Sequence, residues 1–239
     1  MAIKLNLVAG GRPVAPFGQA HFGSSPAFAA VGRSGIPAPP HPTLSELFAA
    51  SARDAGWAGF VLPQVDRAKP LLWVQERMAI LESGRIYPPG LPFAELIHVE
   101  ARDARSLLWA MEEGLRCAAL SAVIGELWGD PAALDFTATR RLAVTAERHG
   151  VAAYLVRLGG HANLSGARMR WRIASAASLP HSLDPRAPGA PCWDAELFRA
   201  RGRAPGRWIV SDDGEALHPG DLAAGPGDRA LGQAERRRA

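Results

Sequence analysis

Residues 103–124, DARSLLWAMEEGLRCAALSAVI, decide the fold class. Four apolar residues of this stretch recur at helical spacing and form one stripe: Leu107, Leu108, Met111 and Leu115. The stripe predicts a helix over residues 103–119, and the apolar run 122–124 directly after it predicts a buried strand. A helix followed at once by an apolar strand indicates an α/β sheet.

The same alternation extends in both directions from this stretch. Apolar runs at 71–74, 96–99 and 151–156 predict three further buried strands. A second helix is predicted over residues 137–149, with Thr137 as its N-cap and Gly150 as its C-terminal stop. Strands that alternate with helices predict a mostly parallel sheet covered by helices on both faces.

The pattern changes after Gly159. Residues 169–173 alternate apolar and charged side chains, which is typical of a half-exposed strand. Residues 196–199 and 207–210 predict a hairpin whose loop is residues 202–206. We therefore expect an antiparallel extension at the C-terminal side of the sheet.

The ends of the chain differ in composition from its middle. Residues 1–42 are rich in proline and glycine, which predicts an irregular segment. Helically spaced apolar residues after Thr43 predict that order begins there with a helix. Residues 218–239 predict a disordered basic tail. The expected organisation is one α/β domain over residues 43–217 between two irregular ends.

The overall composition is that of a chain with a sizeable core and an unusual cation balance. The 239 residues are 48% hydrophobic and carry a net charge of +4. Lys4 and Lys69 are the two lysines, so arginine supplies most of the positive charge. Arginine binds phosphate bidentately, which makes nucleic acid a candidate partner, but GC-rich coding produces the same bias.

The sequence gives no indication of a membrane or secreted protein. No apolar run approaches the roughly 20 residues of a membrane span, and the N-terminus lacks the pattern of a secretory signal. Cys117 and Cys192 lie far apart and are expected to be reduced thiols rather than a disulfide. We therefore expect a cytoplasmic protein.

Motifs for nucleotide hydrolysis, acyl transfer and metal binding are missing from the sequence. It contains no Gly-x-x-x-x-Gly-Lys-Ser/Thr phosphate loop and no Gly-x-Ser-x-Gly elbow. The histidines are scattered and no Cys-x-x-Cys occurs. We therefore expect no catalytic residue, no metal and no cofactor.

Two carboxylates follow predicted strands where such sheets bind ligands. Glu76 comes after the strand at 71–74, and Glu126 follows the strand at 122–124. Glu126 stands where a nucleotide hydrolase places its Mg²⁺-coordinating acid. The pair is either a degenerate nucleotide site or two solvated carboxylates at element ends.

Arginines and tryptophans after Gly159 form two further candidate surfaces. In a strand, Arg168, Arg170 and Arg172 share one face, which is either a stripe that contacts DNA phosphates or a solvated face. The second candidate surface is a partner interface that combines tryptophan and arginine, the residue types enriched at binding hot spots. Its members are Trp171, Trp193, Arg199, Arg201, Arg207 and Trp208. The alternative is that these tryptophans fill a second small core.

Several runs of the sequence together resemble the ImuA family of bacterial mutagenesis proteins. They are WAMEEGLRCAALSAVIGEL at 109–127, TATRRL at 137–142, AERHGV at 146–151, RWRI at 170–173 and the stretch 193–210 with ELFRARG. The resemblance covers residues 43–215. The sequence departs from the family near its start, where LSEL at 44–47 replaces the expected Leu-His-Glu-Val turn.

The resemblance implies a RecA-like fold and a role in DNA-damage-induced mutagenesis. It implies that the protein acts together with an ImuB-like relative of Y-family polymerases and an error-prone C-family DNA polymerase. It also implies a location near the nucleoid during DNA damage. Glu76 matches the RecA glutamate that orients the attacking water, although the phosphate loop is missing. The resemblance therefore implies a non-catalytic adaptor whose direct contact with DNA, if any, is weak and unspecific.

Two other function classes remain open. One is a nucleotide-binding enzyme or ATP-switched regulator with a degenerate site, which Glu76 and Glu126 support. The other is a cell-division inhibitor of the SulA type, a RecA-like relative that binds a tubulin-like protein. Partner binding and ATP turnover discriminate among them.

Overall fold

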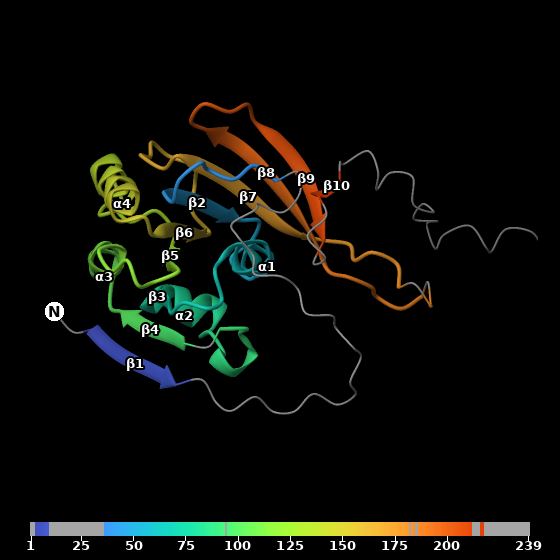
Figure 1. Ribbon diagram of the computed structural model, residues 1–239, viewed down its shortest axis with the longest axis horizontal. Helices are drawn as coiled ribbons and strands as arrows, with labels where there is room; N and C mark the ends of the chain where they lie inside the picture. Colours follow the sequence, from blue (N-terminus) through green and yellow to red (C-terminus); the bar gives the residue numbers. More distant parts are fainter. Residues whose placement is uncertain are drawn as a thin grey trace, which may run out of the picture.

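A computed structural model describes residues 3–9, 36–93, 95–181, 183–184, 186–211 and 216–217. All described strands join one sheet in the order β1-β4-β3-β5-β6-β2-β7-β8-β9-β10 (Figure 1). The pairings from β4 to β7 are parallel, and those from β7 to β10 are antiparallel. The predicted α/β class is confirmed, with a parallel centre and an antiparallel C-terminal extension.

The four predicted central strands all exist and are longer than the apolar runs that revealed them. They are β3 (Leu71–Glu76), β4 (Glu95–Ala101), β5 (Ala122–Trp128) and β6 (Ala152–Leu158). Each continues by one or more residues past its apolar run at its carboxyl end, and these added residues include charged ones. Glu76 and Glu126 therefore lie inside strands rather than after them.

The segment after Thr43 is a strand, so the predicted helix there is wrong. Strand β2 (Leu44–Ala49) lies between β6 and β7 and is parallel to both. Its residues from Leu44 to Phe48 are all buried because both faces of this central strand are covered. A strand buried on both faces loses the period-2 alternation, and its apolar residues then match helical spacing by chance.

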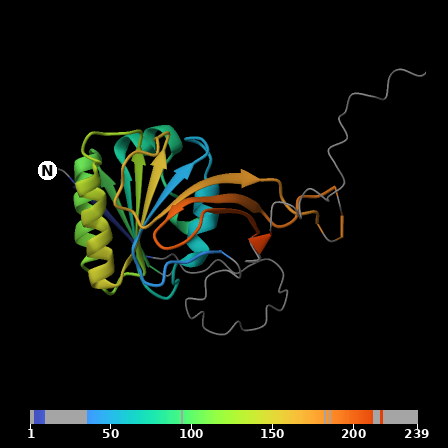
Figure 2. The same cartoon turned by 90° about the horizontal axis from the view of Figure 1, so that it is seen from above.

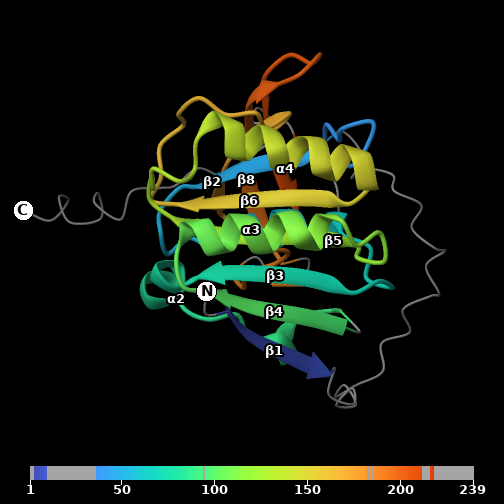
Figure 3. The same cartoon turned by 90° about the vertical axis from the view of Figure 1, so that its left-hand side faces the viewer.

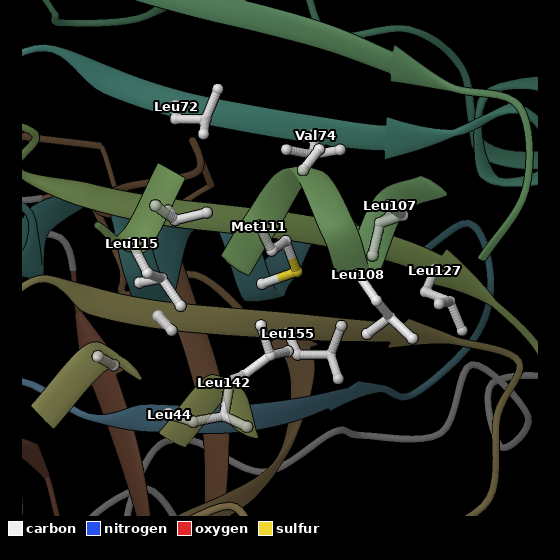
Figure 4. Close-up of a cluster of buried hydrophobic side chains, with 14 of the residues drawn as sticks. Leu44, Leu72, Val74, Leu107, Leu108, Met111, Leu115, Leu127, Leu142 and Leu155 are labelled. Atoms are coloured by element: carbon white, nitrogen blue, oxygen red, sulfur yellow. The ribbon is translucent and has the colours of Figure 1, made fainter. Parts of the chain in front are cut away.

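Two helices cover one face of the sheet. Helix α3 (Ala104–Leu115) packs over β3, β4 and β5, and α4 (Phe136–His149) packs over β6 and β2 (Figure 3). The predicted stripe of α3 is fully buried, and Figure 4 shows it pointing at Val74, Leu127 and Leu155 of the strands. At roughly 1.5–3 kcal/mol for each buried side chain of this size, this stripe is a main anchor of the helix.

Helix α4 begins two residues earlier than the N-cap prediction. Asp135, not Thr137, is the N-cap, and its side chain accepts a hydrogen bond from the Ala138 amide at 2.7 Å. Gly150 ends the helix in the left-handed conformation, as predicted, with φ of 68°.

The opposite face is covered by shorter elements. They are α1 (Gly56–Val61), the 3-10 turn η1 (Leu62–Gln64), α2 (Arg77–Ser83) and the 3-10 turn η2 (Pro88–Gly90). Side chains from α1 and α2 join a second buried cluster on this face. Helices on both faces are therefore confirmed.

The C-terminal strands bend away from the helical layer (Figure 2). They are β7 (Met169–Ala176), β8 (Cys192–Ala200), β9 (Gly206–Ser211) and the short β10 (Ala216–Leu217). The predicted hairpin is confirmed as the antiparallel pair β8–β9. The strand predicted at residues 169–173 is β7, which pairs in parallel with β2 and antiparallel with β8. It is not half-exposed as predicted, since Arg172 is exposed and the other four of these residues are buried.

The N-terminal prediction is partly wrong, because β1 (Ile3–Ala9) pairs antiparallel with β4 at the edge of the sheet. Residues 36–43 of the same predicted irregular segment contain no helix or strand. Residues 10–35 and the predicted tail at 218–239 lie outside the described residues.

Candidate functional site

The carboxyl edge of the parallel strands is the first place to look for a site, because open α/β sheets bind ligands there. Here the loop of residues 50–55 leaves β2 and leads into α1. A phosphate loop would occupy this connection, between a central strand and the helix after it. Because a helix was predicted after Thr43, this loop was not predicted from the sequence.

The loop after β2 is closed by its own carboxylate. Asp54 accepts hydrogen bonds from the Gly56 amide at 2.8 Å, the Ser175 amide at 2.9 Å and the Ser175 hydroxyl at 2.6 Å. Burial acts to raise the pKa of Asp54, but the hydrogen bonds from Ser175 and Gly56 outweigh it and the pKa is lowered. The carboxylate of Asp54 thus accepts the hydrogen bond of the Gly56 amide at the start of α1.

An aromatic residue follows Gly56, where a phosphate loop has its lysine. Trp57 is buried and meets the Trp73 ring edge-on, with 5.6 Å between the ring centroids. Trp57 is a core side chain and supplies no positive charge at this position.

Glu126 lies under these aromatic rings. Its Oε1 accepts hydrogen bonds from Trp73 Nε1 and from Gln75 Nε2, the latter at 3.1 Å. Burial raises the pKa of Glu126 to about 7, against the lowering effect of these two bonds. The group is a buried carboxyl held by neutral donors, because no ion pair involves it within the described part of the chain.

Glu76 has a separate environment. It is buried, and its Oε2 accepts a hydrogen bond from the Trp128 amide at 2.9 Å. Burial raises the pKa of Glu76, the Trp128 bond opposes this, and the charge of Asp103 adds to the rise.

Glu76 and Glu126 do not form one site. Glu126 lies opposite Gln75 in the parallel ladder, so these two side chains share a face, and Glu76, one residue on, points to the other face. The prediction of a shared degenerate site is corrected by this register. The alternative of solvated carboxylates is also wrong, since both side chains are buried.

The middle arginine of the predicted stripe belongs to a buried ion network. Arg170 Nε bonds to Glu46 Oε2 at 2.7 Å, and Arg157 Nη1 bonds to Glu46 Oε1 at 2.8 Å. The side chains of Glu46 and Arg157 are 0% exposed and that of Arg170 is 4% exposed. Arg157 also contacts Asp130, whose second oxygen binds His161. Arg170 is therefore corrected from a DNA contact to a structural residue.

The outer arginines of the stripe are also paired, but at the surface. Arg168 Nε bonds to Glu147 Oε1 at 2.6 Å, and Arg172 Nη1 bonds to Glu196 at 3.1 Å. Arg172 also lies over the Phe198 ring at 4.2 Å. A phosphate group would have to compete with Glu147 and Glu196 for these two arginines.

The predicted tryptophan interface is mostly core. Trp171 and Trp193 are 3% and 8% exposed, and Trp208 packs against Trp171 with 6.0 Å between ring centroids. The prediction that Trp171 and Trp193 anchor a partner is therefore corrected, because both fill the cluster under α1. Trp208 is half-buried at the edge of that cluster.

The arginines of the hairpin are exposed, as an interface requires. Arg199 and Arg201 lie at the end of β8 and in the turn after it, and Arg207 is on β9. Arg207 Nε bonds to Asp194 Oδ1 at 2.7 Å, which raises the pKa of Arg207.

Cys117 is exposed and Cys192 is buried, and no disulfide joins them. Within the described ranges, no helix is long and apolar enough to cross a membrane, and no group of three or more His, Cys, Asp or Glu side chains is arranged to hold a metal.

Comparison with known proteins decides the family. The Protein ImuA of Caulobacter vibrioides, from two strains, is 34% identical to this chain, over 69% of this chain and 70% of the relative. The chain belongs to the ImuA family. No protein-family model matches it. The ImuA resemblance inferred from the sequence is thereby confirmed.

In this ImuA-family chain, the residues not predicted from the sequence are Asp54 and the ion pair of Glu46 with Arg157. Glu46 and Arg157 each interrupt an apolar run, LSELF and YLVRL, and a charge inside a buried strand signals a partner on a neighbouring strand. The sequence around Asp54 gives less indication of its role, because its partner Ser175 comes close to it only in the folded chain.

Proposed function

We propose that this ImuA-family protein is a non-catalytic adaptor of error-prone translesion synthesis in the bacterial DNA-damage response. Family membership connects the chain with DNA-damage mutagenesis. The proposed partners are an ImuB-like relative of Y-family polymerases and an error-prone C-family polymerase. The sheet is proposed to be a RecA-like scaffold that presents binding surfaces without hydrolysing nucleotide.

One observation carries the non-catalytic part of the proposal: Asp54 already occupies the amide at the start of α1. A nucleotide phosphate there would meet a carboxylate with a lowered pKa, so it would be repelled rather than bound. The short helix adds little attraction, and Trp57 supplies no positive charge.

The two carboxylates support the same conclusion. A metal-binding or water-orienting acid must be ionised and must reach the ligand. Glu126 is sealed under Trp73 and Glu76 faces the other side of the sheet, so the pair has no common substrate position.

The adaptor part of the proposal rests on the surface of the C-terminal hairpin. Arg199, Arg201 and Arg207 are exposed there, and Trp208 is half-buried. Arginine and tryptophan are enriched at binding hot spots, where alanine substitution costs about 2 kcal/mol or more.

Two assays on the purified full chain test the proposal. Phosphate release from ATP, with and without single-stranded DNA, should equal the blank and should not change in Glu76→Gln or Glu126→Gln. Turnover that Glu76→Gln abolishes would refute the non-catalytic assignment. The second assay is capture of the ImuB-like protein, with a bacterial tubulin-like protein as the competing partner. Binding to the tubulin-like protein alone would favour a cell-division inhibitor instead.

A further inference from the structure

A groove lies between α4 and the end of β8, away from the sheet edge that carries Asp54. It has a volume of about 510 Å³. We call it the arginine groove and define it by Phe136, Arg140, Val144, Arg168, Arg199 and Arg201. One wall is α4, the floor is the segment that enters β7, and the other wall is the end of β8 with the turn after it.

The groove is held in shape by close backbone packing. Gly166 donates its amide to Thr139 Oγ1 at 2.9 Å, and a Cβ at Gly166 would lie 2.6 Å from the Arg140 Cα. The Arg201 amide donates to the Arg168 carbonyl at 2.9 Å, which ties the β8 wall to the floor. A preformed groove loses little conformational entropy when a ligand binds.

The groove carries excess positive charge. Of its arginines, Arg168 is paired with Glu147, whose pKa is lowered by that hydrogen bond and by the nearby charge of Arg201. Arg140, Arg199 and Arg201 are exposed and form no ion pair with any described residue. An anionic ligand would meet three guanidinium groups outside any described ion pair, although Arg201 already lies near the charge of Glu147.

The same groove exposes apolar side chains. Phe136 and Val144 are 41% and 47% exposed and lie eight residues apart on α4, with Arg140 between them on the same helix face. A nucleic-acid base stacks on an aromatic ring such as Phe136 but not on Val144, whereas an apolar side chain of a peptide would bury both. The combination therefore fits an acidic peptide better than a nucleic acid.

The chain's own C-terminal segment does not suit the groove. Residues 218–239 contain four arginines and three carboxylates, so their charge has the same sign as the groove. Residues 218–239 are therefore not the acidic segment that the groove would bind.

We propose that the arginine groove binds a short acidic segment of a partner protein, with one apolar side chain of that segment seated between Phe136 and Val144. This deepens the proposed adaptor function by naming the chemistry of the bound segment. The carboxylates of the segment bind Arg140, Arg199 and Arg201.

The test uses a fluorescein-labelled peptide, Glu-Glu-Asp-Leu-Phe-Asp-Glu-Glu, and fluorescence polarisation with the full chain. Charge reversal of Arg199 and Arg201 should weaken binding about tenfold or more. The matched control reverses Arg53 and Arg67, which are exposed elsewhere, and should change the dissociation constant less than about twofold because distant charges are screened. Phe136→Ala should weaken binding, and Trp109→Ala, an equally exposed aromatic on α3, should not.

Three outcomes with the peptide would overturn the inference. They are no saturable binding, an equal loss of affinity in the groove and control variants, and equal binding of a peptide with Ser-Ser in place of Leu-Phe. A twelve-residue oligothymidylate that binds more tightly than the peptide and loses affinity in the groove variants would make the groove a nucleic-acid site, and would also overturn it. Circular dichroism confirms folding of each variant. The peptide assay tests the groove, and capture of the ImuB-like protein tests the adaptor proposal. The failure of one proposal is therefore distinguishable from the failure of the other.

Discussion

The sheet buries two groups of ionisable side chains, and they are stabilised in opposite ways. One group lies at β3 and β5, and the other lies at β2, β6 and β7. Glu126 on β5 is surrounded by neutral donors, and burial raises its pKa to about 7. Glu46 on β2 lies between two guanidinium groups, those of Arg157 and Arg170. One region therefore buries an acid that can be neutral, whereas the other buries a carboxylate in ion pairs with two guanidinium groups.

The difference separates two roles that look alike in the sequence. A carboxyl without a cation nearby can hold its proton, and in its neutral form it leaves no uncompensated charge in the core. A carboxylate between two buried arginines cannot be removed without leaving uncompensated charge. Aromatic rings add to this second region, since Arg170 lies 5.3 Å from the ring centroids of both Phe48 and Phe198.

The largest effect is expected from breaking the Glu46 network. Glu46→Ala should lower the free energy of unfolding by about 3–5 kcal/mol, because two buried arginines lose their common partner. The measurement is urea unfolding. Glu113→Ala, which breaks the exposed pair with Arg116, is the matched control and should cost less than about 1 kcal/mol. Equal effects would mean that the network is not a main stabilising element.

Glu126 should make stability depend on pH. The folded chain holds this proton to about pH 7, whereas the ordinary pKa of a glutamate is 4.5, so the folded state binds more protons between these values. The stabilisation is fully present below about pH 4.5 and is lost as the pH rises through about 7. The loss is about 3 kcal/mol for a shift of this size.

Glu126→Gln removes this titration and should be more stable than the parent protein at pH 8, with a difference that shrinks towards pH 5. Thermal unfolding across this range is the measurement. A difference that does not change with pH would show that Glu126 is ionised in the folded protein throughout.

Asp54→Ala should have a smaller effect. The Gly56 amide and the Ser175 backbone and side-chain donors lose their acceptor, at a cost of about 1–2 kcal/mol in this half-buried position. Ser175→Ala keeps both backbone donors paired and should cost less than Asp54→Ala. The reverse order in urea unfolding would contradict the assignment of Asp54 as the residue that closes this loop.

The smallest effect is expected at the surface arginine of β7. Arg172→Ala should lower stability by less than about 1 kcal/mol, because its pair with Glu196 is exposed. If Arg172 contacts DNA phosphate, the substitution should reduce the slope of log affinity against log salt by about 1. An unchanged slope would identify this position as a solvated strand face.

Most of the parallel core could be predicted from the sequence. The stripe of α3 and the apolar runs of β3 to β6 follow directly from periodicity, since side chains that face a core must be apolar. The family was also recognisable from the residues, since 34% of them are identical to the Caulobacter relative over 177 residues. Strand β2 was mistaken for a helix, because a strand covered on both faces has no alternation.

The sequence by itself determined the fold class, the family and the missing phosphate loop, because these depend on local patterns along the chain. Only the tertiary structure decided the fate of the charged residues. Glu46 and Arg170 are 124 positions apart, and Asp54 and Ser175 are 121 apart, so no local pattern relates them. The strand register brings them together and places Glu76 and Glu126 on opposite faces, and this register depends on how the whole sheet packs.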